Sequence, residues 1–329
     1  MNTLPVIGSP RPASRIALGT MIVNRNERER SFALLDAALA AGITTLDCAH
    51  GYAGGESERC IGDWLTDRGC RDAVTILTKG CHPNADRKRV TPDDIGSDLR
   101  DSLARLKTDQ VDIWLLHRDD TSVPVDEIVD CLARHHAAGR IGAYGGSNWT
   151  HQRIAEANAY AASKGLPAFT ASSPNFSLAE QVNDPWGPGC VGIGGPQQAE
   201  ARAWYAEQDI RIFCYSSLAR GLFSGRITRD NFSDVADGAC ATAYCHEVNF
   251  RRLDRAQALA DARGLSVAQV AMAWVLNHSL DVVACCGAAN AEEIAGVVAA
   301  AEAKFDQVTM DWLDLVSDAA PADVATLAH

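Results

Sequence analysis

Short apolar runs alternate with stretches of helical spacing along most of this chain. The apolar runs cover residues 16–18, 44–46, 74–78, 111–116, 143–145, 169–171, 210–215 and 282–284. Apolar positions recur every three or four residues, a spacing typical of helices, at residues 29–41, 57–67, 92–106, 125–138, 150–163, 197–207 and 266–277. Repeated strand–helix units favour a parallel sheet. The eight units predict an α/β fold, a closed (β/α)8 TIM barrel.

Signals at the ends of these elements support the same fold. Thr91 and Pro92, followed by Asp93 and Asp94, form a helix start with a cap, a first-turn proline and early acids. The rival fold, an open doubly wound sheet, would need a G-x-G-x-x-G turn after an early strand, and the sequence has none there. Residues 4–15 predict a short hairpin that caps the barrel floor.

No linker, low-complexity tract or repeat divides the chain, so a single domain over residues 1–329 is predicted. Residues 175–196 are rich in Gly and Pro and contain Trp186. They form too long a segment for a bare connector, which indicates a functional flap. Residues 226–251 form a second long stretch after the seventh strand. Both are predicted to lie at the C-terminal face of the barrel.

Polar side chains stand where three successive predicted strands end. Asp47 follows the second strand, Lys79 ends the third and His117 ends the fourth, with Tyr52 just beyond Asp47. In a parallel barrel these ends meet at one mouth, where barrel enzymes keep their chemistry. Taken alone, each residue also fits a purely structural role, such as a helix cap, an exposed charge or a packed aromatic ring. Their joint placement favours a catalytic site.

Composition and charge narrow the classes of function. The 329 residues are 47% hydrophobic and 22% charged, which is ordinary for a soluble globular protein. No apolar run approaches the ~18 residues needed to span a bilayer. The formal net charge of −12 argues against nucleic acid or anionic membrane as a partner. The N-terminus lacks a secretory signal, so a cytoplasmic location is expected.

Metal and disulfide chemistry find little support. The 11 cysteines are scattered without any C-x-x-C pair, which argues against a disulfide framework and a zinc ribbon. Cys81–His82 and Cys245–His246 offer isolated ligand pairs, but no set of three or four appears at workable spacing. We therefore expect no metal.

With these residues in view, the chain resembles the aldo-keto reductase superfamily over nearly its whole length, in particular its bacterial branch similar to aryl-alcohol dehydrogenases and sugar-type enzymes. The resemblance rests on D-x-A-x-x-Y at 47–52, on the strand-end lysine at 78–80 and on D-x-x-x-x-H at 112–117. It also rests on Gly-Ser-Asn at 146–148 and on the segment 215–222.

The resemblance implies reversible hydride transfer between a nicotinamide cofactor and a carbonyl or alcohol, without metal. Tyr52 would act as general acid and base, and Asp47 would fix Lys79. Lys79 would lower the pKa of Tyr52 from its free value near ~10 toward the ~7 that suits proton transfer. His117 would orient the reacting oxygen.

The resemblance also assigns cofactor contacts. They are Ser147, Asn148, Ser173, Tyr215, Ser216, Leu218, Gly221, Gly287, Ala289, Asn290 and Glu293. Ser173 stands where the family usually has a glutamine for the carboxamide. After the eighth strand the family places Lys or Arg against a 2′-phosphate, whereas this chain has Glu292 and Glu293. Arg220 and Arg226 are then the nearest candidate cations. These residues favour NAD(H), the family favours NADP(H), and both cofactors stay open.

Further polar groups surround the predicted mouth and indicate the substrate. The candidate substrate-binding residues are His50, His82, Arg118, Asp119 and Trp149. Such a lining favours a sugar, a polyol or a related oxygenated carbonyl or alcohol over aromatic aldehydes or steroids. The expected partner is this small molecule, bound by a monomer or homo-oligomer.

Two other functions stay open. One is an epimerase or lyase that oxidises a sugar only transiently and consumes no cofactor. The other is a catalytically inactive dinucleotide-binding barrel, as in reductase-like accessory proteins of membrane channels. The intact Asp47, Tyr52, Lys79 and His117 set argues against the inactive barrel. Away from the mouth, Arg251, Arg252 and Arg255 predict either an exposed helical face or an ion-pair network.

Overall fold

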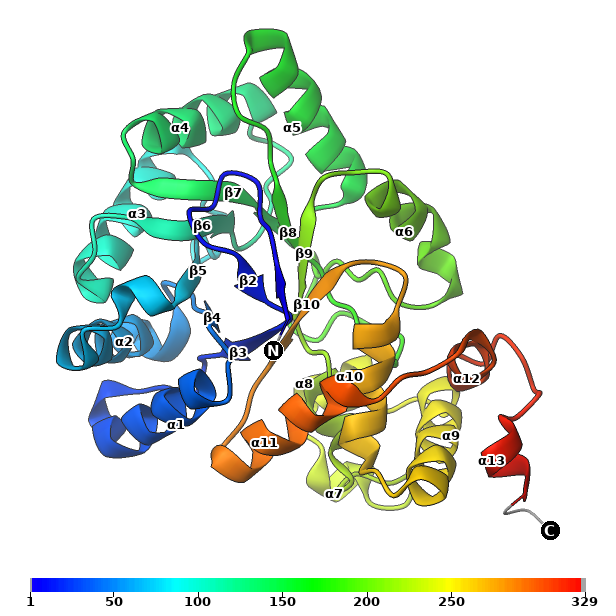
Figure 1. Cartoon of the computed structure of the whole chain (residues 1–329). Coiled ribbons are helices and arrows are strands. Elements are labelled where there is room, and N and C mark those ends of the chain that lie inside the picture. The colour runs from blue at the N-terminus through cyan, green and yellow to red at the C-terminus, as the bar shows by residue number, and fades with distance from the viewer. Residues whose placement is uncertain (1, 327–329) are drawn as a thin grey trace.

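Eight parallel strands close into a barrel in the computed structural model, which describes residues 2–326. Helices surround this barrel on the outside (Figure 1). The closed barrel confirms the predicted fold. The barrel strands are β3 (Ile16–Gly19), β4 (Thr45–Asp47), β5 (Thr75–Gly80), β6 (Val111–Leu116), β7 (Ile141–Ser147), β8 (Ala171–Ser173), β9 (Arg211–Cys214) and β10 (Val282–Cys286). Residues 1 and 327–329 of the predicted domain lie outside the described range.

The outer helices follow the predicted pattern closely. The Thr91 side chain accepts from the Asp94 N–H and the Asp94 side chain from the Thr91 N–H, forming a capping box that begins α3 at Pro92 as expected. The helices that match predicted segments are α1 (Arg28–Ala40), α2 (Glu56–Arg68), α3 (Pro92–Leu106), α4 (Val125–Ala137), α5 (His151–Lys164), α6 (Ala199–Ala206) and α10 (Val267–Asn277). Helix α11 (Ala291–Ala299) follows β10.

Several helices were not predicted. They are α7 (Phe232–Val235), α8 (Gly238–Ala243), α9 (Glu247–Arg263), α12 (Gln307–Leu313) and α13 (Ala322–Ala325). Helix α9 corrects one expectation, because Arg252 is only 1% exposed rather than part of an open face. Its guanidinium pairs with Glu180 at 2.7 Å and with Asp314 at 3.0 Å. The ion-pair alternative therefore holds for Arg252 and for Arg255, which pairs with Asp318 at 2.6 Å, whereas Arg251 is exposed. The pairs of Arg252 join the flap, α9 and the C-terminal segment.

The N-terminal hairpin closes the floor of the barrel. Strands β1 (Thr3–Leu4) and β2 (Ala13–Ser14) pair antiparallel, as predicted for residues 4–15. Val6 and Ala13 pack against inward side chains of the barrel, among them Leu77 and Phe213. Because side chains fill the floor and the interior, a ligand can approach the strand ends from the opposite face.

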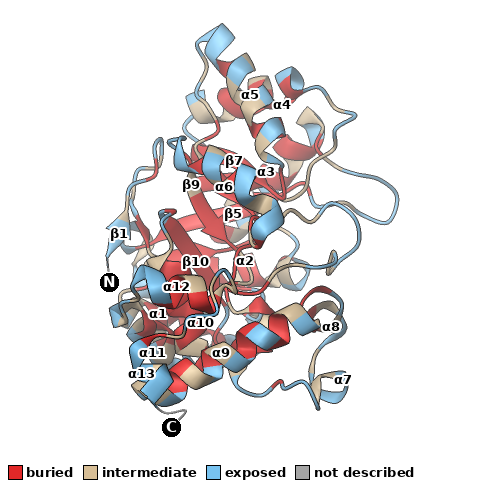
Figure 2. Cartoon of the chain, turned by 90° about the vertical axis from the view of Figure 1, so that its right-hand side faces the viewer, coloured by how far each residue is buried: buried red, intermediate tan, exposed pale blue. Residues whose placement is uncertain are grey.

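Burial shows a second apolar layer between the strands and the helices. In Figure 2 the central strands are buried throughout, while the helices are buried on one side and exposed on the other.

Strands β7 and β8 approach each other closely at one position. A Cβ on Gly145 of β7 would lie 1.7 Å from the carbonyl oxygen of Ala171 in β8, so only glycine fits there. This contact brings the ends of β7 and β8, which carry Ser147 and Ser173, side by side.

The long segment 175–196 lies against the strand ends as the predicted flap. Its first residue, Asn175, accepts from Ile193 at 2.9 Å and donates its N–H to Val191 at 2.8 Å, which ties both ends of the flap together. No helix within residues 2–326 is long and apolar enough to cross a membrane.

Candidate active site

The four predicted catalytic side chains meet at the C-terminal mouth of the barrel. Asp47 ends β4, Lys79 lies in β5, and His117 follows β6. The Lys79 ammonium donates to the Asp47 carboxylate, and it lies 3.0 Å from the Cys48 carbonyl oxygen and 3.4 Å from the Tyr52 hydroxyl. The rings of Tyr52 and His117 meet edge to face with 5.9 Å between centroids. The geometry thus joins all four groups.

A strained turn directs Tyr52 back over the mouth. Tyr52 begins a short helical turn in which Ala53 and Gly54 have φ values of 49° and 63°, followed by Gly55 at 89°. A Cβ on Gly55 would lie 2.7 Å from the Arg105 guanidinium. Glycine at this position allows both the left-handed backbone conformation and the close approach of the Arg105 side chain.

The environment keeps Lys79 charged. Lys79 is 2% exposed, and burial alone would lower its pKa. The charges of Asp47 and Tyr52 and the hydrogen bond to Asp47 outweigh burial, so the pKa of Lys79 is raised above its ordinary value. The buried ammonium is thus a fixed positive charge beside the phenol.

Tyr52 differs from the expectation. Burial, the largest influence, raises the pKa of Tyr52 to about 12, although the charge of Lys79 acts to lower it. The predicted net depression of this pKa is therefore wrong for the protein without ligands, because desolvation of the phenolate outweighs the ammonium. The phenol is protonated throughout the neutral range.

His117 is held neutral. Burial lowers the pKa of His117 well below its ordinary value, and the positive charges of Lys79, His82 and Arg118 lower it further. Its Nδ1 is buried without a hydrogen-bond partner among the described residues. A neutral imidazole carries one N–H, which is available for an oxygen placed between it and Tyr52.

The predicted nicotinamide contacts form a shelf beside the four catalytic groups. The Ser147 hydroxyl donates to the Ser173 carbonyl oxygen at 3.0 Å, and the Asn148 amide lies 3.2 Å from the Ser147 hydroxyl. The Tyr215 hydroxyl donates to Asn148 Oδ1 at 2.7 Å. The Ser173 hydroxyl is fully buried and has no partner among the described residues. An unsatisfied buried hydroxyl at this place fits a ligand carboxamide.

The structure adds a residue that sequence reasoning missed. The hydroxyl of Tyr244, just after α8, accepts from the Asn175 amide at 2.8 Å, and the same amide donates to the Tyr215 carbonyl oxygen at 3.1 Å. Asn175 and Tyr244 thus fix the backbone that carries Tyr215. Tyr244 belongs to the stretch 226–251, which was expected at the C-terminal face, but no pattern within that stretch singled out this residue.

The segment after β9 is tightly curled. Ser216, Arg220 and Gly221 have φ values of 54°, 51° and 94°, and Leu218 lies between them. Arg220 is already engaged, since it pairs with Asp237 at 2.8 Å and its guanidinium carbon lies 5.0 Å from the centroid of the Trp186 ring. Arg226 is exposed and forms no ion pair within residues 2–326.

The segment after β10 supplies its own anion to the start of α11. Following Gly287, the Ala289 N–H donates to the Glu293 carboxylate at 2.8 Å. The Asn290 side chain caps the helix by accepting from the Glu293 N–H at 2.9 Å. A carboxylate therefore occupies one N–H at the helix start, where an anionic ligand would otherwise bind.

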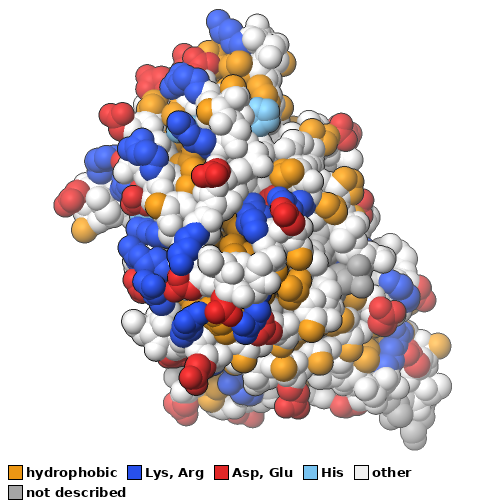
Figure 3. Space-filling model, turned by 60° about the vertical axis from the view of Figure 1, so that its left-hand side comes forward, with side chains coloured by type: hydrophobic (Ala, Val, Ile, Leu, Met, Phe, Trp, Pro, Cys, Tyr) orange, Lys and Arg blue, Asp and Glu red, His pale blue; other side chains and the backbone are white. Residues whose placement is uncertain are grey.

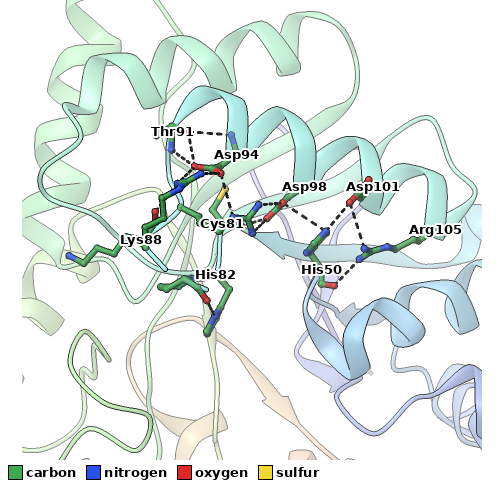
Figure 4. Close-up of polar contacts among 12 residues, drawn as sticks. His50, Cys81, His82, Lys88, Thr91, Asp94, Asp98, Asp101 and Arg105 are labelled. Atoms are coloured by element: carbon green, nitrogen blue, oxygen red, sulfur yellow. Dashed lines mark hydrogen bonds and ion pairs between the residues drawn. The ribbon is translucent and has the colours of Figure 1, made fainter. Parts of the chain in front are cut away.

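The candidate substrate residues separate into two groups. His82 lies at the mouth, with its ring centroid 4.9 Å from that of His117. Arg118 follows His117 on the same loop and donates to the His117 carbonyl oxygen at 3.1 Å. His50 instead turns toward α3, where its Nε2 is 3.3 Å from Asp101, and Figure 4 shows it well apart from His82.

Asp119 and Trp149 also differ from the expectation. Asp119 pairs with Arg153 of α5 at 3.3 Å. Trp149 is 1% exposed and packs on Phe169, and its indole N–H donates to the Arg118 carbonyl oxygen at 3.3 Å. Trp149 therefore supports Arg118 from within the wall instead of lining the mouth, because the close approach of Gly146 leaves a slot for the indole.

No group of three or more metal-ligating side chains was found within residues 2–326.

A closed parallel barrel with a phenol, a buried ammonium and a neutral imidazole at its C-terminal mouth, beside a polar shelf, defines a class of nicotinamide-dependent barrel oxidoreductases. Comparison with known proteins agrees. The sequence model described as "Aldo/keto reductase family" matches residues 15–318. The chain therefore belongs to the aldo/keto reductase family, as the resemblance implied.

Relatives and solved structures show the same likeness. The aldo-keto reductase YhdN of Bacillus subtilis is 28% identical, over 81% of this chain and 78% of that protein. An aldo-keto reductase from Klebsiella pneumoniae, solved in complex with NADPH, has a TM-score of 0.70 and 25% identity, covering 96% of this chain and 95% of that chain. The glycerol dehydrogenase from Gluconobacter oxydans has a TM-score of 0.77 at 22% identity, covering 95% and 94% of the two chains, and shows the fold alone.

Proposed function

We propose that this oxidoreductase interconverts a carbonyl and an alcohol on a polar, oxygenated substrate, with Tyr52 as the general acid and base. The observation that carries the proposal is the contact of the Lys79 ammonium with both the Tyr52 hydroxyl, at 3.4 Å, and the Asp47 carboxylate. A phenol held beside a fixed buried cation can give up its proton to a developing oxyanion, because the cation stabilises the tyrosinate left behind.

The residues share the work as follows. When bound, the nicotinamide cofactor supplies a hydride to the carbonyl carbon, or accepts one in the reverse direction. Tyr52 donates its hydroxyl proton to the carbonyl oxygen, and an alkoxide is a stronger base than a phenolate, so the transfer is favourable even from a pKa of about 12. His117 donates one hydrogen bond to the same oxygen. Asp47 holds Lys79 in place and compensates its charge.

This assignment predicts a flat pH profile for carbonyl reduction. Tyr52 must be protonated to act as an acid, so activity is fully present well below its pKa of about 12 and falls only as the pH rises toward that value. His117, whose pKa is lowered, stays neutral through the same range. We expect kcat for reduction to stay constant within about two-fold from about pH 6 to pH 9, measured by initial rates at saturating cofactor. A fall through about pH 7 would contradict the assignment.

We propose NAD(H) or NADP(H) as the cofactor, and the residues of the site allow a direct test that discriminates between the two. The shelf formed by Ser147, Asn148, Ser173 and Tyr215 would hold the nicotinamide, and the segment from Gly287 to Glu293 would hold the adenosine end. Glu293 on the Ala289 N–H disfavours a 2′-phosphate, whereas the NADPH complex of the Klebsiella pneumoniae relative favours one.

We predict that Ala289→Arg strengthens NADPH binding by about 10- to 100-fold relative to NADH, since a hydrogen-bonded charge pair is worth about 1.5–3 kcal/mol. Titration with each cofactor, followed by quenching of tryptophan fluorescence, measures both dissociation constants. The matched control is Ala162→Arg, at an exposed position on the outer helix α5. An unchanged NADPH affinity in Ala289→Arg would show that the 2′-position lies elsewhere.

A consumption assay tests the proposed function itself. Purified protein is mixed with NADH or NADPH and with glyceraldehyde, an aldohexose or benzaldehyde, and absorbance of the reduced cofactor is followed. Net loss of reduced cofactor, faster with the polar carbonyls, is expected. Conversion of a sugar without net cofactor loss would instead support the epimerase or lyase alternative. Cofactor binding without turnover of any compound would support the inactive barrel.

The state of the cysteines indicates the cellular compartment of the enzyme. All eleven cysteines are free thiols in the structure, and most are buried. This is the pattern expected in a reducing compartment, so we propose a cytoplasmic enzyme that acts on small molecules as a monomer or homo-oligomer.

A further inference from the structure

Arg118 is a cation placed between the catalytic loop and the flap. It directly follows His117 and is partly exposed. Its Nη1 donates to the His117 carbonyl oxygen at 3.1 Å, and its Nη2 lies 3.7 Å from the Cys190 sulfur in the flap. Its own carbonyl oxygen accepts from the buried Trp149 indole. The backbone and side chain are thus both fixed at the edge of the mouth.

No carboxylate forms an ion pair with this charge, and the flap carboxylate next to Cys190, that of Asp184, accepts from the N–H groups of Gly189 and Cys190 instead. Within residues 2–326, no Asp or Glu lies within ion-pair distance of Arg118. The two acids that follow it in the sequence are turned elsewhere. Asp119 pairs with Arg153 at 3.3 Å, and Asp120 lies 3.6 Å from the Lys88 ammonium. The loop therefore removes its own acids from the neighbourhood of Arg118.

Most basic side chains of this protein, unlike Arg118, form ion pairs with carboxylates. On the face shown in Figure 3, basic and acidic side chains are intermixed over the surface. Partly buried arginines without a carboxylate partner use backbone oxygens, as when Arg202 donates to Ile193 and Gly195 at 2.7 and 2.6 Å. Arg118 has one carbonyl oxygen and one weak sulfur acceptor for five N–H donors. It thus keeps unused donors next to the backbone of His117.

The field of Arg118 acts on the groups around the mouth. Burial is the main cause of the lowered pKa of His117 and of the raised pKa values of Tyr215 and Cys190. In all three the charge of Arg118 acts to lower the pKa. The printed contacts place the guanidinium between the backbone of His117 and the Cys190 sulfur of the flap, in agreement with these influences.

We propose that Arg118 binds an oxyanion of the substrate, so that the preferred carbonyl compounds carry a carboxylate or a phosphate. The inference rests on the proposed carbonyl reduction and adds a substrate class to it. A guanidinium presents parallel N–H donors that match either oxyanion in a two-point contact. With a formal net charge of −12, the protein repels anions at long range, so an anionic substrate needs a local cation.

Matched substrate pairs test this inference. Butanal is compared with succinate semialdehyde for a carboxylate, and glyceraldehyde with glyceraldehyde 3-phosphate for a phosphate. The measured quantity is the ratio of kcat/KM for the anionic member to that for the neutral member. In at least one pair, we expect the wild-type enzyme to have a kcat/KM about 10- to 100-fold higher for the anionic compound than for the neutral one. The pair that shows it identifies which oxyanion is recognised.

A charge series at Arg118 separates recognition from a structural role. Arg118→Lys should keep part of the ratio, Arg118→Gln should bring it near one, and Arg118→Glu should bring it below one. A merely structural role would lower both members of a pair equally and would not follow the sign of the charge. Arg251→Gln, at an exposed position on α9, is the matched control and should keep the wild-type ratio.

The outcomes distinguish the two proposals. Turnover of the neutral compounds without any anion preference would overturn the inference and leave the proposed function standing. A preference that persists in Arg118→Gln would also overturn it, because another cation would then bind the oxyanion. Failure to turn over any of the four compounds would count against carbonyl reduction, and against this inference with it.

Discussion

Replacing Tyr52 by phenylalanine is expected to lower kcat for carbonyl reduction by about 10²- to 10⁴-fold, the usual loss when a general acid is removed. The change deletes one oxygen and keeps the ring that meets His117 at 5.9 Å. Cofactor binding should change little, since the predicted shelf is formed by other strands. The measurement is the initial rate at saturating cofactor, together with the cofactor dissociation constant.

Tyr160→Phe is the matched control for this experiment. Tyr160 lies on the outer helix α5, and its hydroxyl is 3.1 Å from Asp130 of α4. Neither residue belongs to the predicted site. The variant should retain wild-type kcat, which shows that loss of a tyrosine hydroxyl is not harmful in itself. If Tyr52→Phe kept more than about a tenth of the activity, the proton would have to come from another group, and His117 would be the first candidate.

The sequence predicted the positions of site residues that lie directly at the end of a strand. Each of Asp47, Lys79 and His117 ends a short apolar run, and a parallel barrel brings all such ends to one face. No contact between distant segments was needed to expect the cluster. Ser147 and Ser173, which the resemblance assigned to the cofactor, also end neighbouring strands.

Properties that depend on packing between distant segments were not predictable. The pKa of Tyr52 is raised because the mouth buries the phenol, and sequence spacing carries no measure of that burial. His50 is polar and close to Tyr52 in sequence, yet it turns to Asp101, which is 51 positions away. Tyr244 reaches Asn175 over 69 positions from a segment without helical spacing. Side-chain direction at the mouth is set by such long-range partners.

The buried pair of Lys79 and Asp47 connects catalysis with stability. Lys79 is 2% and Asp47 5% exposed, and each provides the counter-charge of the other. Breaking a buried pair by removing one partner leaves an uncompensated charge, which costs about 3–5 kcal/mol. We therefore predict that Lys79→Met lowers the free energy of unfolding by about 3–5 kcal/mol, besides losing activity. Unfolding in urea at neutral pH, followed by tryptophan fluorescence, measures the change.

The double variant Asp47→Asn/Lys79→Met should recover most of this loss, because no charge is then left buried alone, and a buried ion pair contributes little net stability against neutral groups of similar size. Lys107→Met is the control, since Lys107 and Asp63 form a pair whose lysine is 48% exposed, and its loss should cost less than about 1 kcal/mol. If the losses at Asp47 and Lys79 simply added in the double variant, the two charges would not be coupled. The fixed ammonium assigned to Lys79 beside Tyr52 would then lose its main physical basis, since the charge of Asp47 is the largest influence that raises the pKa of that lysine.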